Sequence, residues 1–545
     1  MKQNKIPLDG IAGLKQNWSA DAMSGFLVFL LALPLSLGIA QASDFPAVYG
    51  LVTAMVGGVV VSLIAGSPLT IKGPAAGLIV IVAGAVAELG QGNSELGWKL
   101  ALGAIVVAGV IQILFGLMKV GSFSDFFPLS AVHGMLAAIG IIIMSKQLHV
   151  LAGMNPVTHE GKPMFEPIEL LLELRHTFAH FFEHQQVAII GLISLTIVFG
   201  WPMLPFKSLK KIPSALVVLV IAIPLAQFLG VVNVPEIKDA SGTVTQHAFS
   251  PLLSFKQGLT DIIGIRVSFE GFSQMGTFVK YVIMFALVGS LEALLTVKAI
   301  DLLDPFKRRS NSNKDLIALG VGNVIAGILG GLPMISEVAR SSANVNNGGK
   351  TRWSNFFHGI FILIFLVFAI YFSDLIPKSA LAAMLIGVGW KLAHPREFGH
   401  LAKIGTDQIL IFITTILVTL LTDLLVGIAT GILLEMILHL LRDVRIRSLF
   451  TPSYSVNNHT IEIREAAVFS NFIPIKKKIL SFPYNSHLQI DFKKCFFIDH
   501  TVIEALYHIK DDFQNEGGSL TILGIEEFKS ASSHHLAARR NHRKH

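Results

Sequence analysis

GGLPMISEVARSSANVNNGGKT, residues 330–351, is a polar segment that separates two long apolar runs, residues 315–329 and 354–373. It carries a carboxylate, Glu337, and a guanidinium, Arg340, where a short connecting loop would be expected. Charged side chains are costly in apolar surroundings, so their presence there indicates a function. The segment therefore raises two questions: which fold surrounds these charges, and what they bind.

The composition is that of a membrane protein with several spans. Of the 545 residues, 52% are hydrophobic and 14% are charged, whereas about a quarter of the residues in soluble domains are charged. The single cysteine, Cys495, excludes an intramolecular disulfide. The formal net charge of +7 does not indicate a nucleic-acid partner, because basic loops beside membrane spans account for it.

Apolar runs long enough to cross a bilayer, at about 1.5 Å per residue, recur along the chain. Two shorter segments, residues 74–89 and 338–347, have the length of half-spans. With them, the runs amount to about fourteen elements in two sets of seven. The full-length runs are residues 22–43, 49–65, 98–119, 127–148, 186–203, 212–231, 279–300, 315–329, 354–373, 378–393, 407–425 and 427–442.

Basic residues in the short loops orient these spans, because cytoplasmic loops are enriched in Lys and Arg. The clusters fall after even-numbered spans and at the N-terminus, which places them all on one side. Both termini are therefore predicted to be cytoplasmic, and residues 149–185 and 232–278 to be external. The basic residues are Lys2, Lys5, Lys15, Lys207, Lys210, Lys211, Lys307, Arg308, Arg309, Lys314, Lys391, Arg396, Lys403, Arg442, Arg445 and Arg447.

The opening segment has a counterpart in the first half of the chain. AGSPLTIKGPAAG, residues 65–77, aligns with GGLPMISEVARSS, residues 330–342, so that Gly66 matches Gly331. Each segment precedes a half-span at the same place in its set of seven. Sets with an odd number of spans must be inverted relative to one another, and in such folds broken helices meet near the membrane midplane. Their N-termini offer free N–H groups and partial positive charge, which suit an anion.

Two ionisable residues stand near this predicted meeting point. Arg340 lies beside the start of the second half-span, where it either attracts an anion or neutralises a nearby carboxylate. Glu292 lies inside the eighth span, with Thr296 one turn later on the same face. Its candidate roles are cation ligand, proton acceptor and structural partner of Arg340; a permanently neutral, hydrogen-bonded carboxyl is the alternative.

Five motifs resemble those of the SulP family of inorganic anion transporters (sulfate permease type), especially bacterial members related to carbonic-anhydrase-fused transporters. The resemblance covers residues 20–442 and implies an all-α membrane domain of seven plus seven inverted spans. It also implies an anion bound between the third and tenth spans, beside the acidic residue of the eighth, onto which Glu292 falls. The motifs are GPAAG (73–77), SLEALL (290–295), DLLDPFKRRSNSNKDL (301–316), VGNVIAGILGGLP (321–333) and ARSSANVNNGGKTR (339–352).

The resemblance further implies partners and location. Family members carry sulfate, bicarbonate, chloride, oxalate or dicarboxylates, often coupled to Na⁺ or H⁺. We therefore expect no cofactor beyond such a coupling ion, a small inorganic anion as substrate, contact with membrane lipid, and a homodimer in a bacterial inner membrane. A core of spans one to four and eight to eleven would move against a gate of spans five to seven and twelve to fourteen.

The chain departs from the family pattern in the first span. Ala32 and Leu35 flank the pair Leu33-Pro34 where many relatives have Gln, so that Ser36 is the nearest polar side chain. The anion site is therefore expected to rely on backbone N–H groups of the two half-spans. The predicted anion-binding residues are Arg340, Ala339, Ser341, Ser336, Ala75, Ala76, Gly77 and Ser36, and the predicted coupling residues are Glu292 and Thr296.

Two further departures carry opposite charges. Lys72 lies six residues after Gly66, and Glu337 lies six after Gly331, so they are mates in the repeat. The segments LTIK and ISEV could lie antiparallel across the pseudo-two-fold axis, which predicts an ion pair between Lys72 and Glu337. In the alternative, Lys72 itself faces the anion and Glu337 faces a wet cavity.

The composition changes after residue 447, where strands at 460–469, 486–499 and 519–525 and a helix at 501–517 predict a small α/β domain. IDHTVIEAL resembles a conserved turn of STAS domains, in which a Ser or Thr at the place of Thr501 can be phosphorylated; a plain helix N-cap is the alternative. The His-rich end is expected to be a solvated tail rather than a metal site. The expected domains are 1–20 (cytoplasmic segment), 21–447 (membrane domain), 448–530 (STAS-like) and 531–545 (basic tail).

These features favour a coupled anion transporter over a passive channel or uncoupled exchanger, and over an enzyme. An inverted repeat with broken helices provides alternating access around one site. No constellation of nucleophile, base and metal ligands stands out, because the histidines of one external loop lack ligand spacing. These histidines are His149, His159, His176, His180 and His184.

Overall fold

The computed structural model describes residues 6–121, 127–154, 164, 167–181, 183–206, 212–234, 237–238, 244–246, 250–254, 262, 264–372 and 374–541. The chain forms two compact units, residues 1–121 with 139–391, and residues 122–138 with 392–545. Of the residues named above, Lys2, Lys5, His159, Lys207, Lys210 and Lys211 lie outside the described residues.

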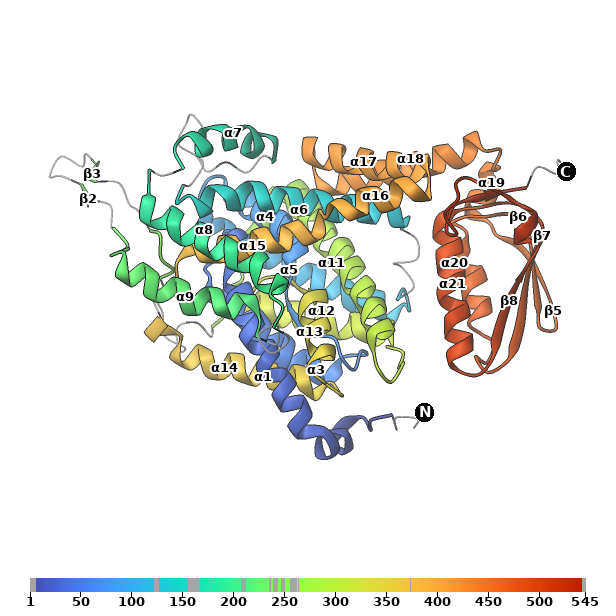
Figure 1. Cartoon of the computed structure of the whole chain (residues 1–545), viewed down its shortest axis with the longest axis horizontal. Coiled ribbons are helices and arrows are strands. Elements are labelled where there is room, and N and C mark those ends of the chain that lie inside the picture. The colour runs from blue at the N-terminus through green and yellow to red at the C-terminus, as the bar shows by residue number, and fades with distance from the viewer. Residues whose placement is uncertain are drawn as a thin grey trace. The chain divides into compact units, whose positions relative to one another are not determined.

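The first unit is a bundle of helices (Figure 1). Each predicted apolar run in it coincides with a helix, whereas helix α7 lies in a segment where none was expected. The helices are α1 (Gly10–Ala42), α2 (Val48–Val56), η1 (Gly57–Val61), α3 (Ser62–Ile64), η2 (Ala76–Leu78), α4 (Ile79–Gly90), α5 (Ser94–Leu117), α7 (Pro167–Ala179), α8 (Gln185–Gly200), η4 (Trp201–Met203), α9 (Ser214–Phe228), η6 (Glu270–Gln274), α11 (Met275–Leu303), α12 (Ser312–Ile328), α13 (Val338–Asn346), α14 (Trp353–Phe368), η7 (Ala369–Phe372) and α15 (Lys378–Leu392).

Helix α6 (Leu129–Leu151) belongs to both units, and the second unit adds α16 (Pro395–Ile404), α17 (Thr406–Leu421), α18 (Leu424–Leu441) and α19 (Ile446–Phe450). Within the described residues, six helical stretches are long and apolar enough to cross a membrane. They are α1, α5, α6, residues 185–203, residues 270–301 and α18.

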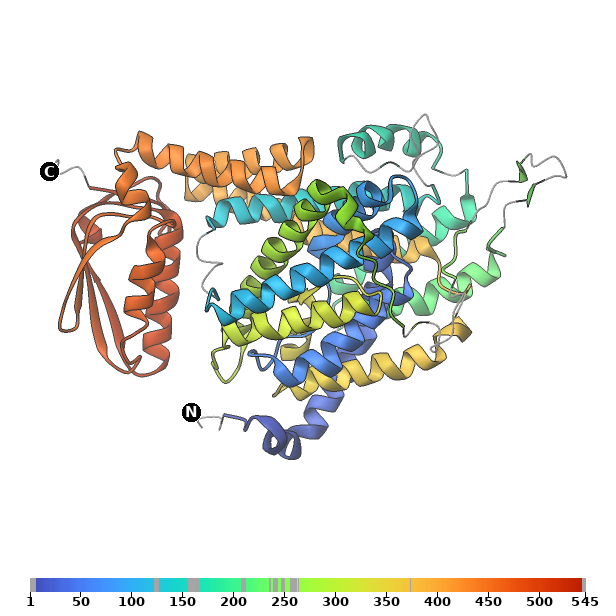
Figure 2. The ribbon, with the colours of Figure 1, turned by 180° about the vertical axis from the view of Figure 1, so that it is seen from behind.

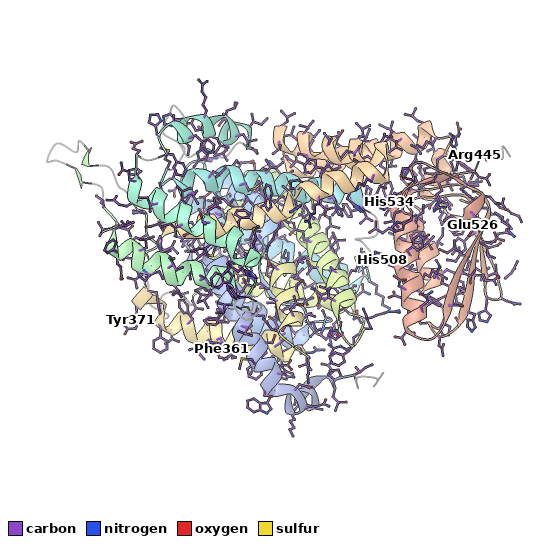
Figure 3. All side chains as sticks on the ribbon, in the orientation of Figure 1. Phe361, Tyr371, Arg445, His508, Glu526 and His534 are labelled. Carbon is purple, nitrogen blue, oxygen red and sulfur yellow. The ribbon has the colours of Figure 1, made fainter. Side chains whose placement is uncertain are left out.

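Close backbone contacts at glycine hold the helices of the first unit together. Gly109 of α5 and Gly320 of α12 face each other, and a methyl group added at either would come within 2.8 Å of the other's carbonyl oxygen. Where α14 meets η1, Gly58 and Gly359 touch in the same way. Small residues let helix backbones approach closely, which is the usual packing of helices in membranes. Elsewhere rings fill the interface: Phe361 of α14, labelled in Figure 3, packs edge-on against a phenylalanine of α1, with ring centroids 5.3 Å apart.

Two short strands join the segments that precede the half-spans. Strand β1 (Lys72–Pro74) pairs antiparallel with β4 (Met334–Ser336), so that Lys72 lies opposite Ser336. The ladder continues on both sides, because Glu337 N donates to Ile71 O at 3.0 Å and Ala75 N donates to Pro333 O at 3.3 Å. The expected antiparallel arrangement of LTIK and ISEV is confirmed.

The predicted ion pair between Lys72 and Glu337 is wrong. Lys72 shares a rung with Ser336, one residue before Glu337, and successive side chains of a strand point to opposite faces. Its ammonium is fully buried and lies 2.8 Å from the Asp315 carboxylate. It also donates to Thr70 Oγ1 at 2.6 Å and to Ser336 Oγ at 2.7 Å. All three N–H groups of Lys72 are thereby satisfied on the face away from Glu337.

Asp315 ties this network to the first half of the chain. It stands in the first turn of α12, whose N-cap Asn311 accepts a hydrogen bond from Lys314 N at 3.0 Å. Its carboxylate accepts from Gly66 N and Ser67 N, each at 3.2 Å, in addition to Lys72. A buried ion pair is tolerated when further hydrogen bonds satisfy both partners, as they do here.

The second unit contains a six-stranded mixed sheet, as the sequence predicted in outline. Its strands run β5-β6-β7-β10-β9, with β8 also paired to β7, and β6, β7 and β8 are parallel. Helices α20 (Phe472–Ile479) and α21 (His500–Asn515) cover one face of it (Figures 1 and 2). The strands are β5 (Ser453–Asn457), β6 (Thr460–Ala467), β7 (His487–Ile498), β8 (Ser519–Leu523), β9 (Lys529–Ser530) and β10 (Arg539–Arg540).

The segment expected to be a solvated tail is in part a strand of this sheet. Arg539 and Arg540 form β10, which pairs antiparallel with both β7 and β9. Ala537 is fully buried, and Ala538 accepts a backbone hydrogen bond from Ala531 at 2.9 Å. Two alanines amid the basic residues supply the apolar surface that the sequence interpretation overlooked. The tail therefore begins no earlier than residue 541.

We predict that the Lys72–Asp315 pair is thermodynamically coupled and that Lys72 and Glu337 are not. Lys72→Met or Asp315→Asn alone should destabilise the protein by about 3–5 kcal/mol, because each leaves an uncompensated buried charge. The double variant Lys72→Met/Asp315→Asn should lose less stability than the sum of the two single losses. Thermal unfolding of the detergent-solubilised chain measures both. Additive effects of Lys72→Met and Asp315→Asn, or coupling of Lys72→Met with Glu337→Gln, would contradict the assignment.

Candidate functional site

Two helices begin beside the β1–β4 ladder. Leu78 N→Ala75 O is the first backbone bond of η2, and Ser341 N→Glu337 O is the first of α13. The preceding N–H groups have no intrahelical acceptor, as at every helix start. Neither N-cap residue, Ala75 or Glu337, caps its helix with a side-chain hydrogen bond. These N–H groups belong to Ala76 and Gly77 in the first helix, and to Val338, Ala339 and Arg340 in the second.

Arg340 lies in the first turn of α13, beside the ladder. It is fully buried, and Nε, Nη1 and Nη2 all lack a hydrogen-bond partner among the described residues. Its guanidinium lies against the backbone of Gly73, where an added methyl group would clash with Nη1. Nε is 3.8 Å from Glu337 Oε2, which is too long for a hydrogen bond. If Arg340 served only to neutralise a carboxylate, that role would explain its 3.8 Å contact with Glu337. It would not explain why the guanidinium nitrogens have no hydrogen-bond partner among the described residues.

Glu292 approaches the other helix start. Its carboxylate lies against Gly77, so that any side chain at that position would collide with Oε1. Glu292 is 6% exposed, and Oε1 has no hydrogen-bond partner in the described chain. Thr296, one turn later on α11, is buried as well. The structure thus brings the predicted coupling residue to the predicted half-span.

His358 of α14 was missed by the sequence analysis. It is fully buried, and neither ring nitrogen has a hydrogen-bond partner in the part of the chain that is described. An ionisable residue inside an apolar run is a functional candidate by default, so the run WSNFFHGIFILI could have drawn attention to it.

Four other predicted anion ligands are engaged elsewhere or packed at another contact. Ser336 Oγ binds Lys72 on the opposite face of the ladder. Ser341 Oγ accepts from Ile71 N at 2.9 Å, and Ala75 N donates to the ladder. Ser36 is buried without a hydrogen-bond partner for Oγ among the described residues, and its carbonyl lies against Gly50. Of these, Ser36 alone keeps a hydroxyl with neither donor nor acceptor role in the described chain.

Thr501 is not the N-cap of α21. Asp499 holds that place, and its carboxylate accepts from Val502 N at 2.8 Å. Thr501 Oγ1 accepts from Leu129 N at 3.4 Å, and the residue is 8% exposed. Phosphorylation of Thr501 would therefore require this hydroxyl to leave its buried position. The structure lends no support to the N-cap alternative and leaves regulation as a prediction.

The arrangement provides a concentrated set of donors. One buried guanidinium and the N–H groups without intrahelical acceptors at two helix starts lie beside the same two-stranded ladder. Charge-assisted hydrogen bonds from such groups are the strongest that proteins make, and oxyanions accept them with several oxygens. If Glu292 and Glu337 are both ionised, their two negative charges exceed the single positive charge of Arg340. A bound anion would add further negative charge to the cluster.

Comparisons with known proteins agree with this chemistry. The Sulfate permease family matches residues 19–415. The putative sulfate transporter YvdB of Bacillus subtilis is 28% identical over 74% of this chain and 70% of its own. The solved transmembrane domain of a cyanobacterium bicarbonate transporter, BicA, has a TM-score of 0.60 at 25% identity, covering 76% of this chain and 98% of its own. The structure of SLC26A9 has a TM-score of 0.66 at 17% identity and shares the fold over 93% of this chain and 84% of its own.

The family match spans most of the helical part of the chain, including both half-spans and the eighth predicted span. Members of this family are membrane anion transporters and not enzymes. Their chemistry requires a site that binds an anion reversibly within apolar surroundings. The chain belongs to the Sulfate permease family of membrane anion transporters.

Proposed function

We propose that this chain is a secondary active transporter of a small inorganic anion of the sulfate or bicarbonate class, working by alternating access and coupled to H⁺ or Na⁺. The observation that carries the proposal is the buried guanidinium of Arg340, with three nitrogens that have no hydrogen-bond partner in the described chain. Leaving buried donors unsatisfied costs about 1–3 kcal/mol for each group, and more when the group is charged. A bound oxyanion would satisfy them.

The anion would bind between the two helix starts. Arg340 supplies the charge, and the N–H groups of Ala76, Gly77 and Ala339 supply further donors. Gly73 and Gly77 leave room for the guanidinium and for Glu292 beside the ladder. Ser36 and His358 are buried polar groups that could complete the site.

Alternating access requires two related halves, and the ladder has the corresponding symmetry. Lys72 pairs with Ser336, and Ile71 accepts from Glu337, the repeat mate of Lys72. A rotation that carries residue 71 to residue 336 and residue 72 to residue 337 maps one rung onto the other. This register supports fourteen spans in a seven-plus-seven inverted repeat, with the third and tenth as half-helices.

Electrostatics favour coupling to a cation. Glu292 and Glu337 together outweigh the charge of Arg340, so an arriving anion meets a net negative cluster if both carboxyls are ionised. Like charges in a low-dielectric site disfavour ionisation. A proton or Na⁺ at Glu292 would remove this repulsion, and binding of anion and cation would then be mutually dependent. A passive channel or an uncoupled exchanger would lack that dependence.

The remaining features of the proposal concern assembly and location. We infer that both termini are cytoplasmic, from the basic loops, and that the protein is a homodimer in a bacterial inner membrane. The α/β sheet of residues 453–540 is proposed to be a STAS-like domain. The mixed sheet with helices on one face supports it (Figure 1).

Our first functional prediction concerns Arg340. Hydrogen bonds to a charged group contribute about 1.5–3 kcal/mol each, so Arg340→Ala should raise the half-saturating anion concentration at least roughly tenfold. Arg340→Lys keeps the positive charge but loses the planar guanidinium with its paired donors. Its half-saturating anion concentration should therefore lie between those of the wild type and Arg340→Ala. Uptake of radiolabelled sulfate and bicarbonate into proteoliposomes measures this. Wild-type affinity and rate in Arg340→Ala, in protein that elutes and unfolds like wild type, would reject the site.

The second functional prediction concerns Glu292. Glu292→Gln removes the group that would hold the coupling cation, so uptake should no longer respond to a pH or Na⁺ gradient, while exchange of anion for anion persists. Glu88→Gln is the matched control. Glu88 lies on α4 and forms an exposed ion pair, at 3.0 Å, with Lys280, which is on α11 like Glu292. Concentrative uptake with unchanged cation dependence in Glu292→Gln would show that coupling resides elsewhere. Conductance far above carrier turnover in the wild type would identify a channel.

A further inference from the structure

A second cluster of buried ionisable groups lies in the other unit, where helix α18 meets the α/β sheet. Glu435 and His439 are one turn apart on the same face of α18. Asp499, the N-cap of α21, lies beside His439 and comes from the α/β part of the unit. His439 Nε2 is 3.8 Å from Glu435 Oε1 and 3.8 Å from Asp499 Oδ2. One atom from each residue lies within 4.8 Å of the other two.

These groups are buried and short of partners. Glu435 is 1% exposed, and neither of its oxygens has a hydrogen-bond partner among the described residues. The same holds for Nδ1 of His439. Arg442, the next basic residue of the segment, is paired with Asp407. A buried carboxylate is costly unless it is protonated or paired with a cation, and among the described residues only His439, at 3.8 Å, is within ion-pair distance of Glu435.

Asp499 is held firmly in place. Its carboxylate accepts from Val502 N and from Phe469 N, at 2.8 and 2.5 Å. Outer hydrogen bonds that fix the orientation of a carboxylate are common around metal ligands.

Aromatic rings enclose the imidazole. The His439 ring lies 5.9 Å from the Phe469 ring and 5.3 Å from the Phe497 ring, measured between centroids. Apolar walls of this kind exclude water and strengthen the attraction between a cation and its ligands. These walls therefore limit access of water to the Glu435 oxygens that have no hydrogen-bond partner among the described residues.

We propose that Glu435, His439 and Asp499 bind one divalent transition-metal ion of the Zn²⁺ class, which links the last apolar helix to the N-terminus of α21. One imidazole and two carboxylates suit Zn²⁺, whereas Ca²⁺ and Mg²⁺ take oxygen ligands in larger numbers. Ligands at about 2.0–2.1 Å from a tetrahedral ion lie roughly 3.3–3.4 Å apart. The two separations from His439 Nε2, each 3.8 Å, need to close by about half an ångström, and the carboxylate oxygens of Glu435 and Asp499, within 4.8 Å of each other, need to close by up to about 1.4 Å. Side-chain rotations provide such movements.

The ion would serve as a joint rather than as a transport ligand. Its two positive charges balance the two carboxylates, and it joins a helix of the membrane-type part of this unit to the first turn of the helix that carries Thr501. Because only the folded arrangement assembles the three ligands, binding would add to the stability of this joint. Occupancy would then depend on the availability of the metal.

The test uses the full-length chain, purified in detergent and stripped with a chelator. Calorimetric titration with Zn²⁺ should show one tight site per chain, and Co²⁺ should give the visible absorption of a tetrahedral complex. Zn²⁺ should also raise the thermal unfolding temperature. Glu435→Gln and His439→Gln should each weaken Zn²⁺ binding by at least about tenfold. Loss of a hydrogen-bond partner of a metal ligand already weakens metal binding by about 10- to 100-fold, and these substitutions remove a ligand itself.

The matched control is His508→Gln. His508, labelled in Figure 3, is half exposed on α21 and lies 3.7 Å from Glu504, so it represents the surface histidines of this unit. It should leave the tight site intact. Two results would overturn the proposal: no binding to the wild type at micromolar Zn²⁺, or tight binding that survives Glu435→Gln and His439→Gln. Should those variants prove unstable, the Co²⁺ spectrum of Asp499→Asn decides, because a retained wild-type spectrum excludes Asp499 as a ligand.

Discussion

Two interruptions of helical structure, near residues 65–75 and 330–337, can exist in apolar surroundings only because each satisfies the other. Backbone N–H and C=O groups without partners are prohibitively costly where water is absent. The β1–β4 ladder supplies those partners and fixes where η2 and α13 begin. Lys72 then anchors the ladder to Asp315 at the start of α12. The positions of the Arg340 guanidinium and of the Gly77 amide follow from this one pairing.

The ladder also sorts charges by face. Lys72 and Asp315 neutralise each other on one side, with every donor of the ammonium in use. Glu337 follows Ser336 at the same end of β4, but as the next residue of the strand it turns its side chain to the opposite face, toward Arg340. One cation is thus a structural element, and the other remains available. An anion transporter needs this separation, because a cation whose donors are all bonded to a carboxylate of the protein has no donor left for a substrate.

Apolar runs located the helices, because each must bury a continuous hydrophobic length, and charges within such runs pointed to Arg340 and Glu292. The sequence could not give strand register. Aligning the repeats identified Lys72 and Glu337 as mates, but mates need not share a rung, and a shift of one residue reverses the face. The partner of Lys72, Asp315, stands at the first residue of a predicted span, and no sequence pattern links it to a lysine 243 residues away. His358 was missed because a lone histidine in an aromatic run has no pattern of its own.

The distance along the chain between ladder partners has a consequence for biogenesis. Lys72 and Asp315 are 243 residues apart, so at about 5–20 residues per second the ribosome needs roughly 12 to 50 s to produce the second partner. Throughout that interval the first half holds a lysine without its carboxylate and a strand without its neighbour. The first half-helix cannot take its final place until α12 arrives. The proposed anion site therefore cannot form before Arg340 has been synthesised, and a chain that ends earlier never contains one.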